Sequence, residues 1–330
     1  MHRTDIPPEL LVTAQVPQLL RFALSDWLVI IVVWLVMWHS PWWVYPFGLL
    51  VVAGRFHALG VVVHDACHMR ARKLTPSSEL LDLVAAYPIA TSVSAMRYHH
   101  LRHHRHNGMA LDPYFKAGVS HDPLRRNLAR MRGLILVPAW ILRSYYGCVA
   151  LAVPALRTSY ARLFLQDHSG KDLSANAEVM ACLRQEPKQA AFFAVVLVVA
   201  WQHPGIVLAY YFAPLLLAGV LNVNRVIVEH IHIPCADRRH ETVAATTVTH
   251  DWGAPGKLFL FPRNIGFHAA HHRFPQVALQ CLPALHRWRE VHAMTSASGR
   301  HHFDAMPTQR VAPEISRAAN RFPMSSHLVD

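Results

Sequence analysis

Histidine is the residue type with the clearest capacity for chemistry in this sequence. The 330 residues hold 25 histidines, against 20 Asp and Glu together. Three clusters have a close spacing: H-x3-H in 64–68, and H-x2-H-H in both 100–104 and 268–272. A shorter signal is His230, which follows Glu229 just after an apolar stretch. Because the chain already carries a net charge of +12, electrostatics gives no reason to gather such side chains three times. The clusters therefore predict a functional site.

The spacing is typical of metal ligands on helices. Residues three and four apart share a helix face, with Cβ atoms about 5–6 Å apart, so the imidazoles of one cluster can converge. Metal ions bind imidazole nitrogen at about 2 Å, and neutral imidazole suits iron, zinc, copper and nickel. The candidates are more than one ion can use, and two ions with four or five nitrogens each would fit. We predict a dinuclear centre with the ligands His64, His68, His100, His103, His104, His230, His268, His271 and His272.

Neighbouring histidines are left out of this set on geometric grounds. His99 and His106 lie off the shared face of their cluster, which predicts a supporting or surface role. His232 is two residues from His230, so both cannot reach one metal from the same helix. His230 is preferred because a membrane helix ends just before it. Isolated histidines such as His203 are predicted to be interfacial or solvated.

Carboxylates are scarce in these motifs. A ferritin-like di-iron site needs several Glu, including two Glu-x-x-His pairs, and this sequence has only Glu229 with His232. The zinc-protease motif H-E-x-x-H is absent as well. Nearby acidic and amide groups are better suited to accept the second N–H of a ligating imidazole and to orient it. The predicted orienting residues are Asp65, Asp112, Glu229 and Asn264; for Asp112 a simple Asp-Pro turn is an equal alternative.

The elements that must position the histidines are predicted to be membrane helices. Apolar residues make up 53% of the chain, charged residues 16%, and the mean hydropathy is +0.19, which is more apolar than an ordinary soluble enzyme. One apolar block covers 26–54 and is broken at 39–41, and a second covers 190–223 and is broken at 202–205. Each block predicts two membrane helices joined by a tight turn, near the required 20 or so residues once their flanks are included. Buried helices of a soluble protein are the alternative.

The remaining segments are predicted to lie outside the bilayer. Arg55 is costly in mid-membrane, so residues 56–68 should continue their helix beyond it. Residues 80–94 and 133–156 are less apolar and are expected to lie at the interface. The Lys and Arg residues avoid both turns, and 17 of the 32 lie in 64–189. By the positive-inside rule, both termini and the histidine clusters are cytoplasmic.

These observations predict an all-α integral membrane protein. About four transmembrane helices would form two hairpins, beneath a cytoplasmic helical cap that carries the histidine clusters. The chain is expected to be a single domain over 1–330, with its core at about 55–288 and a polar C-terminal tail at about 300–330. The five cysteines are odd in number and widely spaced, which excludes a disulfide scaffold.

The clusters His-Asp-Ala-Cys-His, His-His-Leu-Arg-His-His and His-Ala-Ala-His-His, set around two apolar hairpins, resemble the three histidine boxes of the membrane fatty acid desaturase and hydroxylase family. The likeness extends from about Arg55 to Trp288. It implies a di-iron centre that uses O2 and two external electrons to abstract hydrogen from an unactivated C–H bond. The eight box histidines match the family's boxes and His230 matches its additional histidine. The Ala-Ala of the third box departs from the bulkier or acidic residues of many lipid desaturases, so the substrate stays open.

The leading functional hypothesis is therefore an oxygen-dependent desaturase that acts on an acyl chain, bound in a lipid or as a thioester. A hydroxylase, or a desaturase of a small metabolite such as dihydrorhizobitoxine, is the alternative within the family. Electrons would come from an external donor of the ferredoxin or cytochrome b5 type, because the chain has no nucleotide-binding G-x-G-x-x-G motif. In a bacterium the protein would lie in the inner or plasma membrane. A histidine-rich metal transporter is the alternative of another class, and a nucleic-acid-binding role rests on charge alone.

Overall fold

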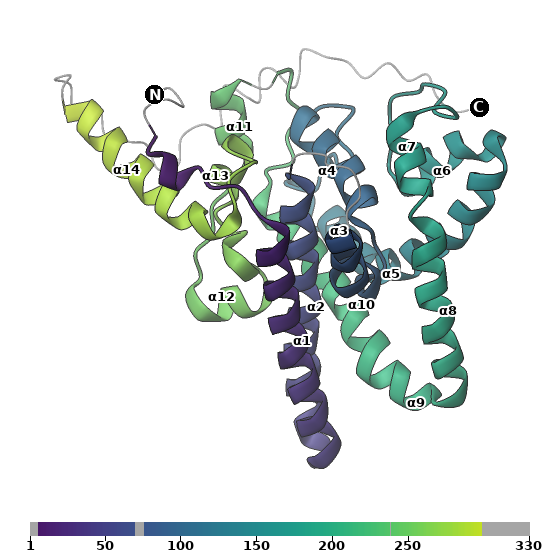
Figure 1. Cartoon of the computed structure of the whole chain (residues 1–330). Helices are drawn as coiled ribbons and strands as arrows, with labels where there is room; N and C mark the ends of the chain where they lie inside the picture. Colours follow the sequence, from purple (N-terminus) through teal and green to yellow (C-terminus); the bar gives the residue numbers. More distant parts are fainter. Residues whose placement is uncertain (1–5, 70–75, 238, 299–330) are drawn as a thin grey trace. The chain divides into compact units, whose positions relative to one another are not determined.

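The computed structural model describes residues 6–69, 76–237 and 239–298, which form helices joined by loops (Figure 1). Within these ranges the only β interaction is an isolated antiparallel bridge between His230 and Thr247. The chain divides into two compact units, Met1–Arg287 and Trp288–Asp330. The predicted tail at 300–330 lies outside the described residues. All elements that carry the candidate site belong to the first unit.

The first predicted hairpin is present. Helix α1 (Val16–His39) ends at Ser40-Pro41, a 3-10 turn covers Trp42–Val44, and helix α2 (Tyr45–Cys67) runs back alongside α1. Pro41 has no backbone N–H to donate, and it disfavours a helical conformation at Ser40, which accounts for the break. As expected, α2 extends without interruption past Arg55 to the first histidine cluster.

The second hairpin consists of helix α8 (Glu186–Gln202), a break at His203, the short helix α9 (Pro204–Val207), a π-helical turn (Leu208–Phe212) and helix α10 (Ala213–Glu229). The tips of the two hairpins lie side by side (Figure 1). There the Tyr45 hydroxyl donates to the Ala209 carbonyl at 2.8 Å, and the rings of Trp38 and Tyr210 are 6.2 Å apart. The histidines lie at the opposite ends of α2 and α10.

Among the described residues, four helical segments are long and apolar enough to cross a membrane: α1, Trp42–Cys67, helix α5 (Pro123–Ala152) and Pro204–Glu229. Their number agrees with the prediction, but one member differs. The prediction counted α8, which has 17 residues, and placed 133–156 at the interface. In α5 the Arg143 guanidinium is buried and lies 2.9 Å from the carboxylate of Glu186 in α8, so this charged group is paired inside the protein.

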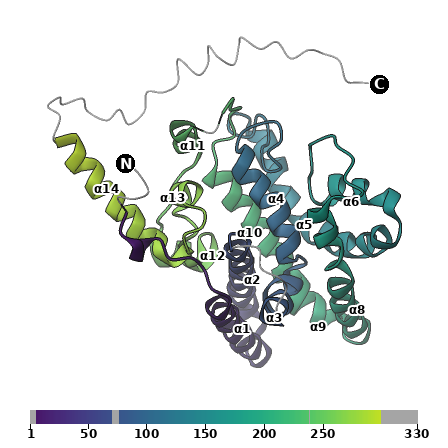
Figure 2. The same cartoon turned by 45° about the horizontal axis from the view of Figure 1, so that its top comes forward.

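The second histidine cluster lies on helix α4 (Val93–His106), which begins where Ser92 Oγ accepts a hydrogen bond from the backbone N–H of Ala95. The third lies on helix α13 (His268–Arg273). Figure 2 shows α4 and α13 on two sides of the adjoining ends of α2 and α10. The other helices are α3 (Pro76–Leu81), α6 (Arg157–Phe164), α7 (Ala177–Leu183), α11 (His240–Thr246), α12 (Gly253–Phe259) and α14 (Leu282–Ser298). A π-helical turn covers Asp82–Ala86, and 3-10 turns cover Pro8–Leu10, Tyr87–Ile89, Pro154–Leu156, Pro262–Asn264 and Leu279–Cys281.

Candidate metal centre

Four separate segments bring histidines to one place. The last turn of α2 carries His64, and His68 caps the C-terminus of that helix. Helix α4 supplies three histidines, α13 supplies three more, and His230 is the first residue after α10. All nine histidines that the sequence singled out as ligands therefore lie together in two groups. Within each group, the possible ligand nitrogens lie within 4.8 Å of one another.

The first group has five members, which are His64, His68, His100, His104 and His271. The Nε2 atom of His100 lies 2.8 Å from Nε2 of His68 and 3.0 Å from Nε2 of His104. Nε2 of His104 is in turn 3.1 Å from Nε2 of His271. Ligand atoms that surround one ion at about 2.0–2.1 Å are themselves about 3 Å apart, so these nitrogens have the spacing of a shared coordination sphere.

The second group has four members, which are His103, His230, His268 and His272. Nε2 of His268 lies 2.9 Å from Nε2 of His230, and the His103 and His230 rings are 4.6 Å apart. The two groups adjoin, because the rings of His104 and His272 stack at 4.3 Å. Two neighbouring ions, one in each group, are therefore sterically compatible with this arrangement.

Helix geometry divides each H-x2-H-H box between the groups. In α4 the pair four residues apart, His100 and His104, enters the first group while His103 enters the second. In α13 the pair four residues apart enters the second group while His271 enters the first. The sequence predicted a shared helix face for each box. In the structure, the histidine three positions after the first one of each box points to the neighbouring group.

The imidazoles are held in the neutral form that binds metals. Burial lowers the pKa of His68 to about 3, and it lowers the pKa of His100, His104 and His230 well below the usual value. The neighbouring imidazoles lower the pKa of these last three rings further, because each resists a second positive charge. The ring nitrogens are therefore available as electron-pair donors at neutral pH.

Several buried ring nitrogens lack a hydrogen-bond partner within the described part of the chain, including Nε2 of His103 and both nitrogens of His64. Burying a polar group without a partner is costly, so such atoms call for a ligand. An all-imidazole donor set fits a first-row transition metal and is unsuited to magnesium or calcium, which prefer oxygen. The residues present thus fit first-row transition-metal ions, and iron is one of these.

Two of the four predicted orienting residues lie against the histidines. Asp112 Oδ1 accepts a hydrogen bond from Nδ1 of His103 at 2.8 Å, which directs Nε2 of that ring toward the second group. Glu229 Oε2 lies 3.4 Å from Nδ1 of His268 and also accepts from Arg225 at 2.6 Å. Burial alone would raise the pKa of Asp112, but His103 and two backbone N–H groups more than offset this and lower it.

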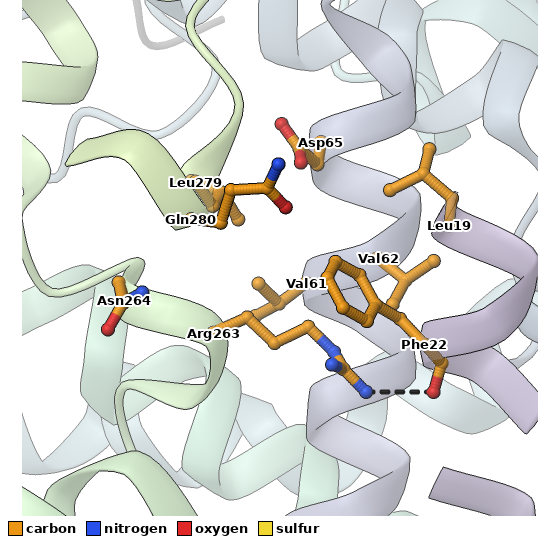
Figure 3. Close-up of a pocket in the computed structure, with 9 residues that line it drawn as sticks. All are labelled: Leu19, Phe22, Val61, Val62, Asp65, Arg263, Asn264, Leu279 and Gln280. Carbon is orange, nitrogen blue, oxygen red and sulfur yellow. Dashed lines mark hydrogen bonds between the residues drawn. The ribbon is translucent and has the colours of Figure 1, made fainter. Parts of the chain in front are cut away.

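Asp65 and Asn264 have a different place. Among the described residues, neither is hydrogen-bonded to one of the nine imidazoles. Both line a cavity of about 210 Å³ between α1, α2 and the segments before and after α13 (Figure 3). Its walls are mostly apolar, and Arg263 and Gln280 add polar groups. The proposed orienting role of these two residues stays a prediction.

The histidines excluded on geometric grounds also have identifiable positions. Nδ1 of His99 is 2.8 Å from the Tyr114 hydroxyl, and burial lowers the pKa of His99 to about 3. His232 belongs to neither group, and its Nδ1 accepts a hydrogen bond from the backbone N–H of Lys116 at 3.4 Å. The sequence did not single out Tyr114, whose ring stacks on His103 at 4.4 Å. Its only signal was its place directly after Asp112-Pro113.

Comparison with known proteins agrees with this geometry. No curated protein matches the chain. Residues 40–303, however, match the family model "Fatty acid desaturase". The matched stretch contains all nine histidines and three of the four segments that can cross a membrane in full. Because this match covers well over half of the sequence, the chain belongs to the fatty acid desaturase family.

Proposed function

We propose that the protein is an oxygen-dependent, di-iron desaturase that introduces a double bond into an acyl chain carried by a lipid or a thioester. The observation that carries the proposal is the pair of buried histidine groups, five and four imidazoles strong, in a member of the fatty acid desaturase family. The proposal includes the nine histidines as ligands and two metal ions per chain.

When bound, two iron ions would supply the oxidation of an unactivated C–H bond with O2 and two external electrons. The residues of the chain would do the rest. The nine imidazoles would hold the ions. Asp112 keeps the His103 ring in the tautomer whose Nε2 lone pair can bind a metal. Glu229 gives His268 a carboxylate neighbour, while Arg225 balances the charge of that carboxylate. Burial of eight of the nine rings keeps bulk water away from the site.

The partners follow from the same proposal. The sequence has no nucleotide-binding G-x-G-x-x-G motif and no cysteine set for an iron–sulfur cluster, so a ferredoxin or a cytochrome b5 with its reductase would supply the electrons. The substrate would reach the site from the membrane lipid. The distribution of Lys and Arg supports a cytoplasmic location for the termini and the histidines, in the inner or plasma membrane of a bacterium. A small-metabolite substrate and hydroxylation are the alternatives within the family.

The metal-transporter alternative receives less support. A transporter needs ligands distributed along a path through its spans. Here the nine histidines gather in one place, at and beyond the ends of α2 and α10. The hairpin tips carry only isolated histidines, such as the exposed His203.

Metal analysis of the purified protein tests the proposal. We expect about two irons per chain in the wild type. We expect His104→Ala and His271→Ala to lose iron together with O2-dependent product formation, because each removes a ligand from the first group. His203→Ala, in the exposed hairpin turn, is the matched control and should keep both. Zinc without iron after anaerobic iron loading, or full metal retention in both ligand variants, would contradict the di-iron centre.

Product analysis tests the reaction. The reconstituted enzyme, with O2, a reductase and a ferredoxin, is given phospholipids, acyl thioesters and small amino-acid-like metabolites in separate assays. Desaturation of an acyl substrate, seen as a loss of two mass units, is the expected result. A gain of sixteen mass units would identify a hydroxylase, and turnover of the small metabolites alone would favour the other alternative.

A further inference from the structure

A buried carboxylate on α1 links the first membrane helix to the segment that precedes the third histidine box. Asp26 is only 2% exposed, and each of its carboxylate oxygens contacts a different arginine. Oδ1 lies 3.2 Å from Arg55 of α2, and Oδ2 lies 2.5 Å from Arg263. None of the nine histidines lies on α1, so this helix has no direct part in the candidate metal centre.

Arg263 lies where the backbone is unfavourable. Its φ angle is +55°, and Asn264 follows with φ at +64°, so two consecutive non-glycine residues adopt the left-handed conformation. Side chains with a Cβ rarely adopt it, and such a geometry persists only where surrounding contacts impose it. These residues come four and five positions before His268. The orientation with which the chain enters α13 therefore depends on what holds Arg263.

The contacts of Arg263 all point toward α1. Its Nη2 atom donates to the Phe22 carbonyl at 2.8 Å (Figure 3). The same atom also donates to Asp26. Its guanidinium also lies over the Phe22 ring, 4.3 Å from the ring centre. The side chain is thereby fixed on one face of α1, beside the cavity described above.

The second arginine and a neighbouring histidine fix the end of α12. Arg55 Nη2 donates to the Leu258 carbonyl at 2.6 Å, and Nδ1 of His57 lies 2.7 Å from the Phe259 carbonyl. A side chain at Gly54 would come within 2.6 Å of the Leu258 carbonyl, so α2 approaches this segment closely. Residues 258–264 are thus held by α2 on one side and by α1 on the other.

We propose that Asp26 is a positioning residue for the third histidine box, which it holds in register with α2 through Arg263 and Arg55. The proposal rests on the proposed metal centre for its consequence, although the contacts themselves do not depend on it. Helix α13 supplies two of the four ligands of the second group and one of the five of the first. Loss of the Asp26 contacts should therefore affect the second group more than the first.

The test compares Asp26→Asn with a variant that loses a comparably buried ion pair elsewhere. Glu186→Gln is suitable, because Glu186 is fully buried and pairs with Arg143 between α8 and α5. Metal content and the absorption spectrum after cobalt loading are measured on the full-length protein, together with thermal stability. We expect about two ions per chain in the wild type and in Glu186→Gln, and about one in Asp26→Asn.

A double variant identifies the group that loses its ion. Adding His272→Ala to Asp26→Asn should change the metal content little, because the second group is already empty. Adding His68→Ala should remove the remaining ion. Two ions in Asp26→Asn, equal loss from both groups, or the same loss in Glu186→Gln would overturn the positioning role.

Hydrogen exchange of the metal-free protein separates this inference from the proposed function. Asp26→Asn should speed amide exchange in residues 253–273 at least tenfold and leave α4 unchanged. This result is expected even if the wild type were found to hold no pair of metal ions, which would contradict only the proposed function. Unchanged exchange in residues 253–273 would overturn the inference whatever the metal content.

Discussion

Asp112 is an acidic side chain near the histidines whose two carboxylate oxygens both accept hydrogen bonds. Its two oxygens accept hydrogen bonds from Nδ1 of His103 and from the backbone N–H groups of Gly108 and Tyr114, at 2.8–2.9 Å. These bonds fold the loop after α4 back onto the helix and fix the tautomer of one ring. A carboxylate in this position also makes the imidazole a stronger donor.

Removing this charge should weaken the second metal group. Asp112→Asn can still accept a hydrogen bond from His103, but it loses the negative charge that strengthens the ring as a ligand. We expect metal affinity to fall about 10–100-fold, as measured by competition with a chelator. Asp122→Asn, which alters an exposed acid at the start of α5, is the control and should leave the affinity unchanged. An unchanged affinity in Asp112→Asn would show that its loop contacts are purely structural.

The sequence predicted which histidines lie together, but it did not predict how they are divided between the two groups. Spacing of three and four residues is visible in the sequence, and it identified eight of the nine members of the two groups, whereas His230 was predicted from its place just after an apolar stretch. The division between groups depends on where neighbouring helices lie, so His100 and His103 could not be separated in advance. Arg263 gave no signal either, because its partner Asp26 is 237 residues away in the chain.

The start of α4 depends on a second buried acid. Asp82 Oδ1 accepts a hydrogen bond from the backbone N–H of Val93, at the first turn of the helix, at 2.7 Å. Burial raises the pKa of Asp82 to about 6, from 3.8. A carboxyl group with a raised pKa in the folded state stabilises the protein below pH 3.8, and this contribution is lost as the pH rises through 6.

Asp82→Asn should therefore change how stability depends on pH. The amide keeps an acceptor for Val93 and stays neutral, so the variant should match the wild type near pH 4 and exceed it at pH 7 by up to about 3 kcal/mol. Thermal unfolding of the detergent-purified protein at a series of pH values measures this difference. Parallel curves for the two proteins would contradict a buried Asp82 with a raised pKa.

Hydropathy predicted both hairpins, and it placed residues 133–156 at the interface, although α5 is also long and apolar enough to cross a membrane. Both hairpins were visible as apolar blocks broken at 39–41 and 202–205. What the sequence did not show is that Arg143 of α5 is buried against Glu186 of α8, because the two residues lie on different helices. Helix α5 also packs closely on α10, where a side chain at Gly133 would come within 2.5 Å of the Val220 backbone. Such a contact is invisible in a single sequence.

The first unit, Met1–Arg287, has two chemically distinct ends. Exposed apolar side chains such as Trp42 and Trp201 lie at the hairpin tips, where their amphipathic rings suit a membrane interface. The opposite end of this unit holds the nine histidines, together with charged residues such as Arg239. A cytoplasmic location for this end is part of the proposed function and can be tested directly.

Cysteine labelling tests the orientation. Trp201→Cys places a thiol at a side chain that is 86% exposed in the hairpin tip, and Arg239→Cys places one at the histidine end. In intact cells a membrane-impermeant maleimide should label the first and not the second, and permeabilised cells should allow both. The unmodified protein measures the background from its own five cysteines. If only Arg239→Cys were labelled in intact cells, the orientation would be opposite to the proposed one.

The separation of the ligands along the chain has a consequence for biosynthesis. His64 and His272 lie 208 residues apart, and each group needs imidazoles from both sides of the second hairpin. At about 5–20 residues per second, ribosomes need roughly 10–40 s to make that stretch. During this interval neither group has its complete set of imidazoles, so the proposed pair of ions could not yet be bound in full. Under the proposed function, both iron ions would be in place only after translation, and the cell's supply of iron at that moment would set how much of the newly inserted protein becomes active.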